Sequence, residues 1–296
     1  MRSLMLRYML YDALIRPDEW HFALIHDEQR TAAWLAAVLI DMKERFSSSV
    51  FFQEHMPRIL FLSNSGELPI LPLLLASYLP QKLSELNTSP CGVNIQIVEP
   101  LTPVAAAIKE CIEDNDLEEL VSITSTADRG KSEESGQTPD EPVDLLIVPG
   151  LEDPSRFLAV LEDLESAVEG GVLHSNSRIL PSRTRLVAAG LQVEAQTNPV
   201  RAPLGRISGF DMLDFNALRG PRSTPDVVRL RDIKHEMLTQ PVELKSFQFT
   251  NNGDGTFGDD SSWKLQPGEW EVPLSIIADG QCSAIAVWME TEMLSS

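Results

Sequence analysis

Arg58–Leu62 reads RILFL, and the turn-forming stretch Ser63–Gly66 (SNSG) follows it directly. A short apolar run that ends at such a turn is typical of a strand buried on both faces of a parallel sheet. Further runs of the same kind occur along the chain. They are Val93–Val98 (VNIQIV), Leu120–Thr124 (LVSIT) and Val143–Val148 (VDLLIV). The sequence therefore predicts four buried, parallel strands.

Amphipathic helices are predicted between these strands. In Asp27–Phe46, apolar residues recur at intervals of three and four, which is the helical period. Another helical stretch runs through Leu79, and two more cover Pro103–Asp114 and Asp153–Glu169. Strands that alternate with helices predict an α/β fold with a parallel sheet and right-handed crossovers. A further strand is predicted over Arg185–Val193.

The last third of the chain shows strand patterns without long helices between them. Apolar and polar residues alternate in Val242–Phe249, Trp270–Ile276 and Ser283–Met289. The dipeptide Asp279-Gly280 lies between the last two segments and is a strong signal for a hairpin turn. These patterns predict a second, antiparallel domain, and we expect its sheet or barrel to be unfinished where the sequence ends.

The chain divides into three predicted parts. Residues 1–19 form an N-terminal helix or linker, residues 20–197 form the α/β domain, and residues 198–296 form the β domain. Within the α/β domain, residues 126–142 are polar and rich in Ser, Gly, Asp and Glu. Because such a segment buries too little apolar surface to order itself, it is predicted to be a disordered insertion.

Composition excludes several kinds of partner. The sequence has 24 basic and 44 acidic residues and a formal net charge of -20. Such a surface repels nucleic acids and anionic membranes and attracts basic peptides, although solubility alone also explains it. No apolar run reaches the roughly 20 residues that span a bilayer. We therefore expect neither nucleic acid nor membrane as a partner.

The three cysteines have no C-x-x-C spacing. This disfavours a disulfide framework or a zinc site and suits a reducing compartment.

Two residues at predicted strand ends suit a nucleoside ligand. Gly66 lies in the turn after the first strand, where a glycine lets the backbone approach a ligand at a helix N-terminus. Glu99 ends the second strand, where a carboxylate can accept both ribose hydroxyls. Gly66 also suits an ordinary strand-to-helix turn, and Glu99 a solvated strand end. The sequence leaves both interpretations open.

A longer pattern introduces the first helix. Leu24–Thr31 reads LIHDEQRT, and Trp34 follows in an alanine-rich helix. This segment resembles the entrance to the cofactor domain of the protein arginine methyltransferases. Ser208–Asp211 resembles the domain junction of that family, and Pro241–Leu244 and Ala284–Glu290 resemble its barrel strands. The resemblance implies a Rossmann-like S-adenosylmethionine-dependent methyltransferase domain followed by an antiparallel β-barrel that is cut short.

The resemblance also implies a cofactor site. Arg30 would clamp the methionine carboxylate of S-adenosylmethionine by a bidentate pair. Glu99 would bind the ribose, and Gly66 and Asp27 would complete the outline of the site. Plainer roles stay open, since Arg30 suits a surface ion pair with Asp27 or Glu28, and Asp27 suits the N-cap of the helix.

Several positions depart from the family pattern. Phe61 or Leu62 stands where the family has an acid near the end of the first strand, and Ser63 and Ser65 replace glycines. In the family, two glutamates grip the substrate guanidinium and aim it at the methyl group. Their positions fall on Pro149 and Leu158 in this chain. No catalytic residue is therefore assigned.

Two other acids, Glu152 and Asp153, lie near the lost pair but at the wrong spacing. They are better explained as the start of a helix, where acids interact favourably with the dipole.

These losses resemble the second, C-terminal module of the tandem-module family members, those numbered seven and nine. The resemblance implies a catalytically silent module that packs on an active methyltransferase module, in the same chain or as a dimer. The substrates would be Arg-rich proteins, and we expect a cytoplasmic location, with the nucleus as a second one. Two alternatives remain: a non-catalytic binding module for Arg-rich peptides, and an active methyltransferase for another substrate class.

Overall fold

The computed structural model of the protein describes residues 27–48, 56–63, 70–85, 92–99, 102–125, 142–152, 157–193, 206–207, 210–211, 234–249 and 271–294. The N-terminal segment 1–19, Gly66 and residues 126–141 of the predicted insertion lie outside these ranges. The predictions for them therefore stay predictions.

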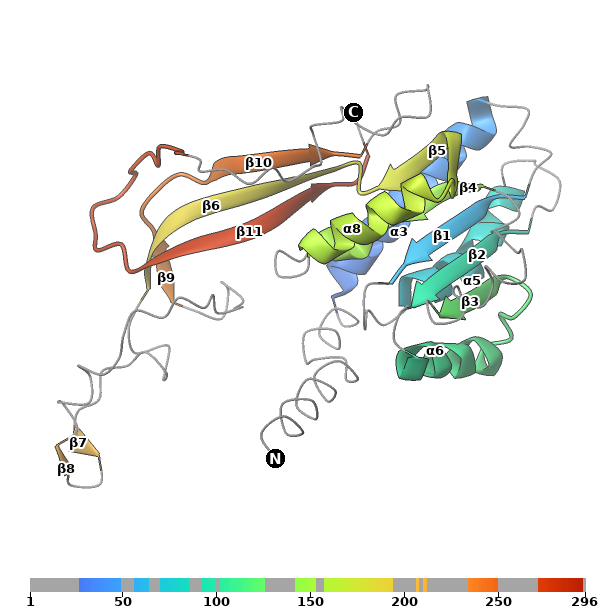
Figure 1. Ribbon diagram of the computed structural model, residues 1–296, viewed down its shortest axis with the longest axis horizontal. Helices are drawn as coiled ribbons and strands as arrows, with labels where there is room; N and C mark the ends of the chain where they lie inside the picture. The colour runs from blue at the N-terminus through green and yellow to red at the C-terminus, as the bar shows by residue number, and fades with distance from the viewer. Residues whose placement is uncertain are drawn as a thin grey trace. The chain divides into compact units, whose positions relative to one another are not determined.

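Five parallel strands form one sheet in the order β3-β2-β1-β4-β5 (Figure 1). The strands are β1 (Arg58–Leu62), β2 (Asn94–Glu99), β3 (Val121–Ser125), β4 (Val143–Ile147) and β5 (Leu173–Leu180). The order reverses between β1 and β4, which is the switch point of a Rossmann-like sheet. The predicted α/β fold with a parallel sheet is confirmed.

Helices cover both faces of this sheet. They are α3 (Glu28–Ser48), α5 (Ile70–Ser84), α6 (Thr102–Asp114) and α8 (Phe157–Glu169). Ile59 and Phe61 of β1 pack in one hydrophobic cluster with residues of α3, α5 and α6. Leu60 and Leu62 pack in another cluster with residues of α8. Because successive side chains of a strand point to opposite faces, α8 lies across the sheet from the other three helices.

Local sequence signals explain the buried face of α3 and the end of α8. Trp34, Val38 and Met42 follow one another at four-residue intervals in α3 and are almost fully buried, as one stripe of a helix should be. After α8, Gly171 has a φ of 69°. This left-handed conformation suits glycine at a helix C-terminus and lets the chain turn into β5.

A second sheet has the order β10-β6-β11, and β9 also pairs with β6. Its strands are β6 (Arg183–Val193), β9 (His235–Met237), β10 (Val242–Gln248) and β11 (Ala284–Glu292). The pairing of β6 with β9 is antiparallel. Strands predicted over Val242–Phe249 and Ser283–Met289 are confirmed, with small shifts at their ends. Closure of this sheet into a barrel stays a prediction.

The fifth strand of the parallel sheet is β5, which the sequence pattern does not predict. The strand predicted over Arg185–Val193 belongs instead to the second sheet, as β6. The reason is composition: after Leu173, β5 continues with the polar residues His174, Ser175 and Asn176, so it lacks the continuous apolar run of the other parallel strands.

The hairpin predicted around Asp279-Gly280 is wrong. The segment before it forms only an isolated bridge, and Ile277 N donates to Leu238 O over 2.8 Å. This segment therefore runs beside the chain that follows β9, whereas β11 pairs with β6. A Cβ atom on Gly280 would lie 2.7 Å from Leu238 Cδ2. Close packing, rather than a hairpin turn, thus accounts for this glycine.

The chain separates into two compact units. The first consists of Met1–Arg185, Ser246–Gln266 and Met289–Ser296, and the second of Leu186–Lys245 and Pro267–Trp288. The division passes through β6, β10 and β11, whereas the sequence predicts a single boundary after residue 197. All residues of the site described below belong to the first unit.

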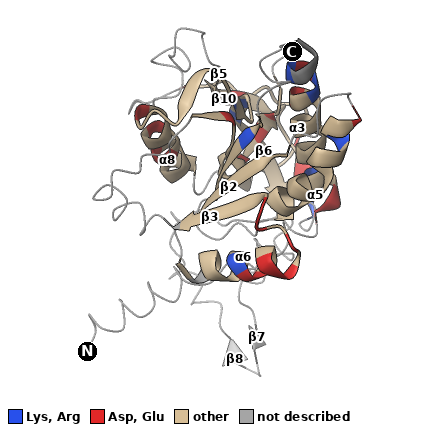
Figure 2. Ribbon diagram, turned by 90° about the vertical axis from the view of Figure 1, so that its right-hand side faces the viewer, with Lys and Arg blue, Asp and Glu red and all other residues tan. Residues whose placement is uncertain are grey.

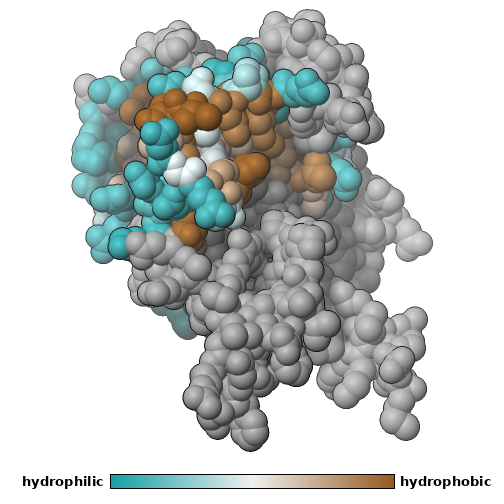
Figure 3. Space-filling model, turned by 90° about the vertical axis from the view of Figure 1, so that its left-hand side faces the viewer, coloured by the Kyte–Doolittle hydropathy of each residue, from teal (hydrophilic) through white to brown (hydrophobic). Residues whose placement is uncertain are grey.

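Exposed acidic residues gather at the end of α6 and in the segment that leads to β3 (Figure 2). We call this set the acidic ridge; it consists of Glu110, Glu113, Asp114, Asp116, Glu118 and Glu119. The second unit has an exposed hydrophobic area instead (Figure 3), with Ile276, Ile277 and Ile285 more than half exposed. None of the described helices is long and apolar enough to cross a membrane.

Candidate functional site

The carboxyl ends of β2, β1 and β4 adjoin one another, because these strands are neighbours in the sheet. Rossmann-like sheets bind ligands outside the carboxyl ends of their strands, at the switch point. Described residues at this place are Ser63 after β1, Glu99 at the end of β2, and the short 3-10 helix η1 (Pro149–Glu152) after β4. We call these residues the carboxyl edge.

Glu99 is completely buried in the carboxyl edge. Ser63 Oγ donates a hydrogen bond to Glu99 Oε2, and Ser63 N donates to Val98 O over 2.9 Å. A buried carboxylate costs free energy unless it is hydrogen-bonded, and the Ser63 hydroxyl supplies a bond that a glycine could not. The position of Glu99 suits the predicted ribose contact, which stays a prediction.

Asp27 caps α3. Its Oδ1 accepts a hydrogen bond from Arg30 N over 3.0 Å, and its carbonyl oxygen accepts one from Thr31 N over 3.0 Å. This is the geometry of an N-cap, which satisfies a donor that the first helical turn leaves open. The structure therefore gives Asp27 the plainer of its two predicted roles, and its part in cofactor binding stays a prediction.

Arg30 pairs with Glu152, and not with Asp27 or Glu28. Arg30 Nε donates to Glu152 Oε2 over 2.6 Å, and the two side chains are 21% and 22% exposed. The other oxygen of the carboxylate, Oε1, accepts a bond from Trp34 Nε1 over 2.8 Å. Arg30 and the buried Trp34 thus each bond one oxygen of Glu152. Through these two bonds, Glu152 joins η1 to the first turns of α3.

Sequence reasoning missed this contact. The sequence pattern favours Glu152 as the start of a helix, whereas the residue ends η1 and binds Arg30 and Trp34. The described part of α8 begins only at Phe157. An ion pair between residues far apart in the sequence leaves no periodic pattern. The signal for this contact in the sequence is Glu152 itself, an acid close to the position of the lost glutamate pair but at a different spacing.

The two positions that carry substrate-gripping glutamates in the resembled family hold apolar residues. Pro149 is buried in η1, and Leu158 is 57% exposed on α8. Neither side chain can accept a hydrogen bond from a guanidinium. Glu152 is the acid that η1 contributes, and each of its two oxygens accepts one described hydrogen bond, from Arg30 or from Trp34.

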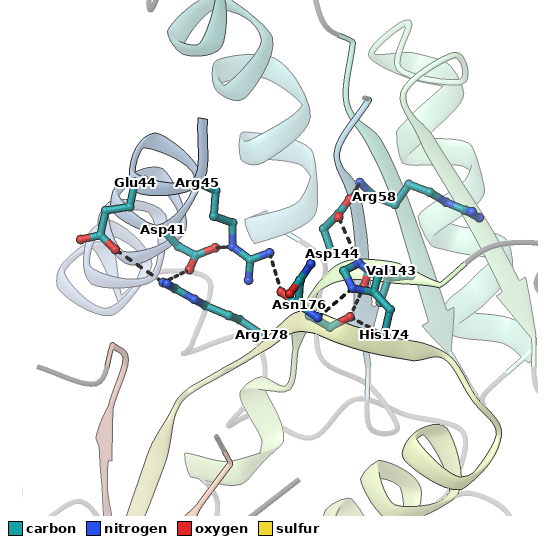
Figure 4. A network of polar contacts seen from close by, with 10 residues as sticks. Asp41, Glu44, Arg45, Arg58, Val143, Asp144, His174, Asn176 and Arg178 are labelled. Carbon is teal, nitrogen blue, oxygen red and sulfur yellow. Dashed lines mark hydrogen bonds and ion pairs between the residues drawn. The ribbon is translucent and has the colours of Figure 1, made fainter. Parts of the chain in front are cut away.

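A buried ionic network lies elsewhere, between α3 and β5 (Figure 4). Asp41 Oδ1 lies 2.6 Å from Arg178 Nη1, and Asp41 Oδ2 lies 2.9 Å from Arg45 Nε. Arg45 Nη1 donates to Asn176 O over 3.1 Å. Burial raises the pKa of Asp41, although Arg45 and Arg178 oppose this shift, and burial also lowers the pKa of Arg45. Both shifts reflect the cost of removing a charge from water.

Asp144 of β4 is buried next to this network (Figure 4). Its Oδ2 accepts a hydrogen bond from Arg58 N over 2.8 Å, and its Oδ1 lies 3.3 Å from His174 Nε2. His174 Nδ1 accepts a bond from Asn176 N over 3.0 Å, so Nε2 carries the proton that faces Asp144. These residues lie at the amino ends of β1, β4 and β5. The network therefore suits a structural role, at the edge opposite to ligand sites.

No group of three His, Cys, Asp or Glu among the described residues is arranged to hold a metal ion. Cys111 and Cys282 are exposed thiols, and not the packing residues that their small apolar side chains suggest.

No protein-family model matches the chain, and no curated protein matches its sequence. Among solved structures, the PRMT1 enzyme–prozyme heterotetrameric complex of Trypanosoma brucei with AdoHcy is similar, with 19% identity and a TM-score of 0.47, over 78% of this chain and 62% of that chain. PRMT6 has 13% identity and a TM-score of 0.36, over 77% of this chain and 64% of its own. The cyclase SpnF has 12% identity and a TM-score of 0.29, over 50% of this chain and 44% of its own. The chain thus spans less than two thirds of each protein. At these values the similarities establish neither an activity nor a ligand for this chain.

Proposed function

We propose that this chain is a Rossmann-like S-adenosylmethionine-binding module of the protein arginine methyltransferase type that does not itself transfer methyl groups. One observation carries the proposal. The carboxyl edge keeps an acid at the end of β2, Glu99, but has Pro149 where the resembled family has its first substrate-binding glutamate. Methyl transfer to a guanidinium depends on carboxylates that position it. Cofactor binding does not require them.

In this proposal, four residues form the cofactor site. Glu99 accepts hydrogen bonds from the ribose hydroxyls, and the guanidinium of Arg30 binds the carboxylate of the methionine part. Gly66 lets the chain after β1 approach the ligand. Asp27 contributes indirectly, because its N-cap bond to Arg30 N fixes the start of α3.

The module acts through a partner in this proposal. It packs on a catalytically active methyltransferase module, in the same chain or as the second half of a dimer, and that module methylates Arg-rich proteins in the cytoplasm or nucleus. A methyltransferase-type domain without its substrate-gripping carboxylates can still contribute folding and packing surface to such an assembly.

A methylation assay tests the proposed silence. The purified chain is incubated with labelled S-adenosylmethionine and Arg-Gly-rich peptides, and an active arginine methyltransferase serves as the positive control. We expect no label in the peptides from the chain alone. Label transferred by the chain alone would contradict the proposal and support the alternative of an active methyltransferase for another substrate class.

The acidic ridge favours a second candidate, a binding module for Arg-rich peptides. Six exposed carboxylates between Glu110 and Glu119 attract a basic peptide, and the attraction weakens as salt increases. Fluorescence titration with an Arg-Gly-rich peptide distinguishes the candidates. Two results together would replace the first proposal with this one. The chain would bind the peptide but not S-adenosylmethionine, and the double variant Glu118→Gln with Glu119→Gln would bind the peptide more weakly.

A further inference from the structure

Arg30 of α3 and Glu152 of the carboxyl edge present opposite charges side by side. Arg30 Nε and Glu152 Oε2 are 2.6 Å apart, and about one fifth of each side chain is exposed. The pair is neither sealed from solvent nor fully hydrated. Part of each side chain is therefore in contact with solvent, and each charge acts more strongly than it would in bulk water.

Both groups keep hydrogen-bonding capacity after they have paired. Among the described residues, the Arg30 guanidinium donates only through Nε, although the group has five donors. Each Glu152 oxygen accepts one described bond, from Arg30 or from Trp34, and a carboxylate offers about four acceptor positions. The pair thus retains donors on its positive side and acceptors on its negative side.

Trp34 makes the pair rigid. Its indole N–H donates to Glu152 Oε1 over 2.8 Å, and its ring is only 1% exposed within the core under α3. Glu152 is therefore fixed against both partners, and the guanidinium of Arg30 is oriented by the bond to Nε. Groups that are fixed before binding lose less conformational freedom when a ligand arrives.

We propose that Arg30 and Glu152 together recognise an α-amino-acid zwitterion: Arg30 binds its carboxylate, and Glu152 binds its ammonium group. The proposal deepens and rests on the proposed function, because S-adenosylmethionine carries such a zwitterion at the end away from its adenosine. Glu152 then acts as a ligand contact that the resembled family's pattern does not predict. An alternative, purely structural role would use the pair only to fasten η1 to α3.

A comparison of two ligands separates these roles. S-Adenosylhomocysteine and 5′-methylthioadenosine share the nucleoside and the uncharged thioether, and only the first carries an amino-acid group. Both are titrated by calorimetry into the full chain and into Glu152→Gln, Glu99→Ala and Glu28→Gln. Glu28 is exposed on the first turn of α3 and controls for the loss of one negative charge there.

We expect Glu152→Gln to weaken S-adenosylhomocysteine by about tenfold, the usual effect of losing one charge-assisted hydrogen bond, and to leave 5′-methylthioadenosine within about twofold. Glu99→Ala should weaken both ligands, and Glu28→Gln neither. Thermal unfolding checks that each variant is folded. If Glu152→Gln does not fold, Arg30→Lys tests the pair from its other side, and the same selective loss is expected.

Four results would overturn the inference. If Glu152→Gln weakens the binding of both ligands equally, or changes the binding of neither, the pair has a structural role only. The proposed function would still stand in that case, provided that Glu99→Ala loses the binding of both ligands. Tighter S-adenosylhomocysteine binding by Glu152→Gln would show that Glu152 competes with the ligand. A wild-type chain that binds neither ligand would overturn this inference together with the proposed function.

Discussion

Arg30 Nε donates a hydrogen bond to Glu152 Oε2 over 2.6 Å, although 122 positions separate the two residues in the sequence. The bond connects the start of α3 with the segment that follows β4. Trp34 strengthens the connection through its own bond to Glu152. Arg30, for which the family resemblance implies a cofactor contact, thus pairs with Glu152, an acid that the sequence pattern places at the start of a helix.

The bond between Ser63 and Glu99 should stabilise the fold. Ser63→Ala removes a donor to a fully buried carboxylate. We expect a loss of about 2 kcal/mol in the free energy of unfolding, since a buried carboxylate loses a hydrogen bond that offsets part of its desolvation cost. Urea denaturation measures this. The control is Ser77→Ala, because Ser77 is exposed and, among the described residues, its hydroxyl bonds only the carbonyl of Leu73. It should change stability by less than about 0.5 kcal/mol. Equal effects of the two variants would contradict the prediction.

Leu75 should be a major contributor to the core between α5 and the sheet. It is completely buried in the cluster that contains Ile59 and Phe61. Leu75→Ala should cost about 3 kcal/mol, because it loses transfer free energy and leaves a cavity. Leu158→Ala provides the matched control, since Leu158 is 57% exposed, and it should cost less than about 0.5 kcal/mol. A Leu75→Ala chain as stable as its control would show that α5 does not pack as described.

Asp41 gives stability a defined pH dependence. Burial raises its pKa above the ordinary value of 3.8, although Arg45 and Arg178 oppose the shift. The folded chain therefore holds the Asp41 proton more tightly than the unfolded chain. Its contribution to stability is full below the unfolded pKa and is lost as the pH rises through the folded pKa.

Asp41→Asn isolates this effect, because asparagine does not titrate. The free energy of unfolding of the wild type, minus that of the variant, should fall as the pH rises above 3.8. Urea titrations at a series of pH values measure the difference. A difference that grows with pH would mean that the two arginines outweigh burial.

Much of the α/β fold follows from local sequence patterns. Arg58–Leu62 and Val143–Val148 are continuous apolar runs, and such runs form buried parallel strands because both faces are covered. The helix that begins after Asp27 follows from its cap and its apolar period. The end of α5 was less predictable, since the helix continues through Pro80 to Ser84, and packing overrides the breaking tendency of proline.

The rest depends on contacts between distant segments. His174 and Asn176 make β5 look polar. The contact of His174 with Asp144 and that of the Asn176 carbonyl with Arg45 cannot be read from the sequence of a single strand. In the site, the position of Glu99 follows from the strand that it ends. The pairing of Arg30 with Glu152 does not follow, since loop geometry after β4 decides which acid reaches α3.

The most direct test of the central claim is a calorimetric titration of S-adenosylmethionine into the purified chain and into Glu99→Ala. The account predicts that the wild type binds with a Kd on the order of 10 μM. The variant should bind at least about tenfold more weakly, because it lacks the carboxylate that accepts hydrogen bonds from the ribose. No binding at millimolar ligand, or equal affinity of the two proteins, would contradict the claim that this Rossmann-like module keeps a cofactor site.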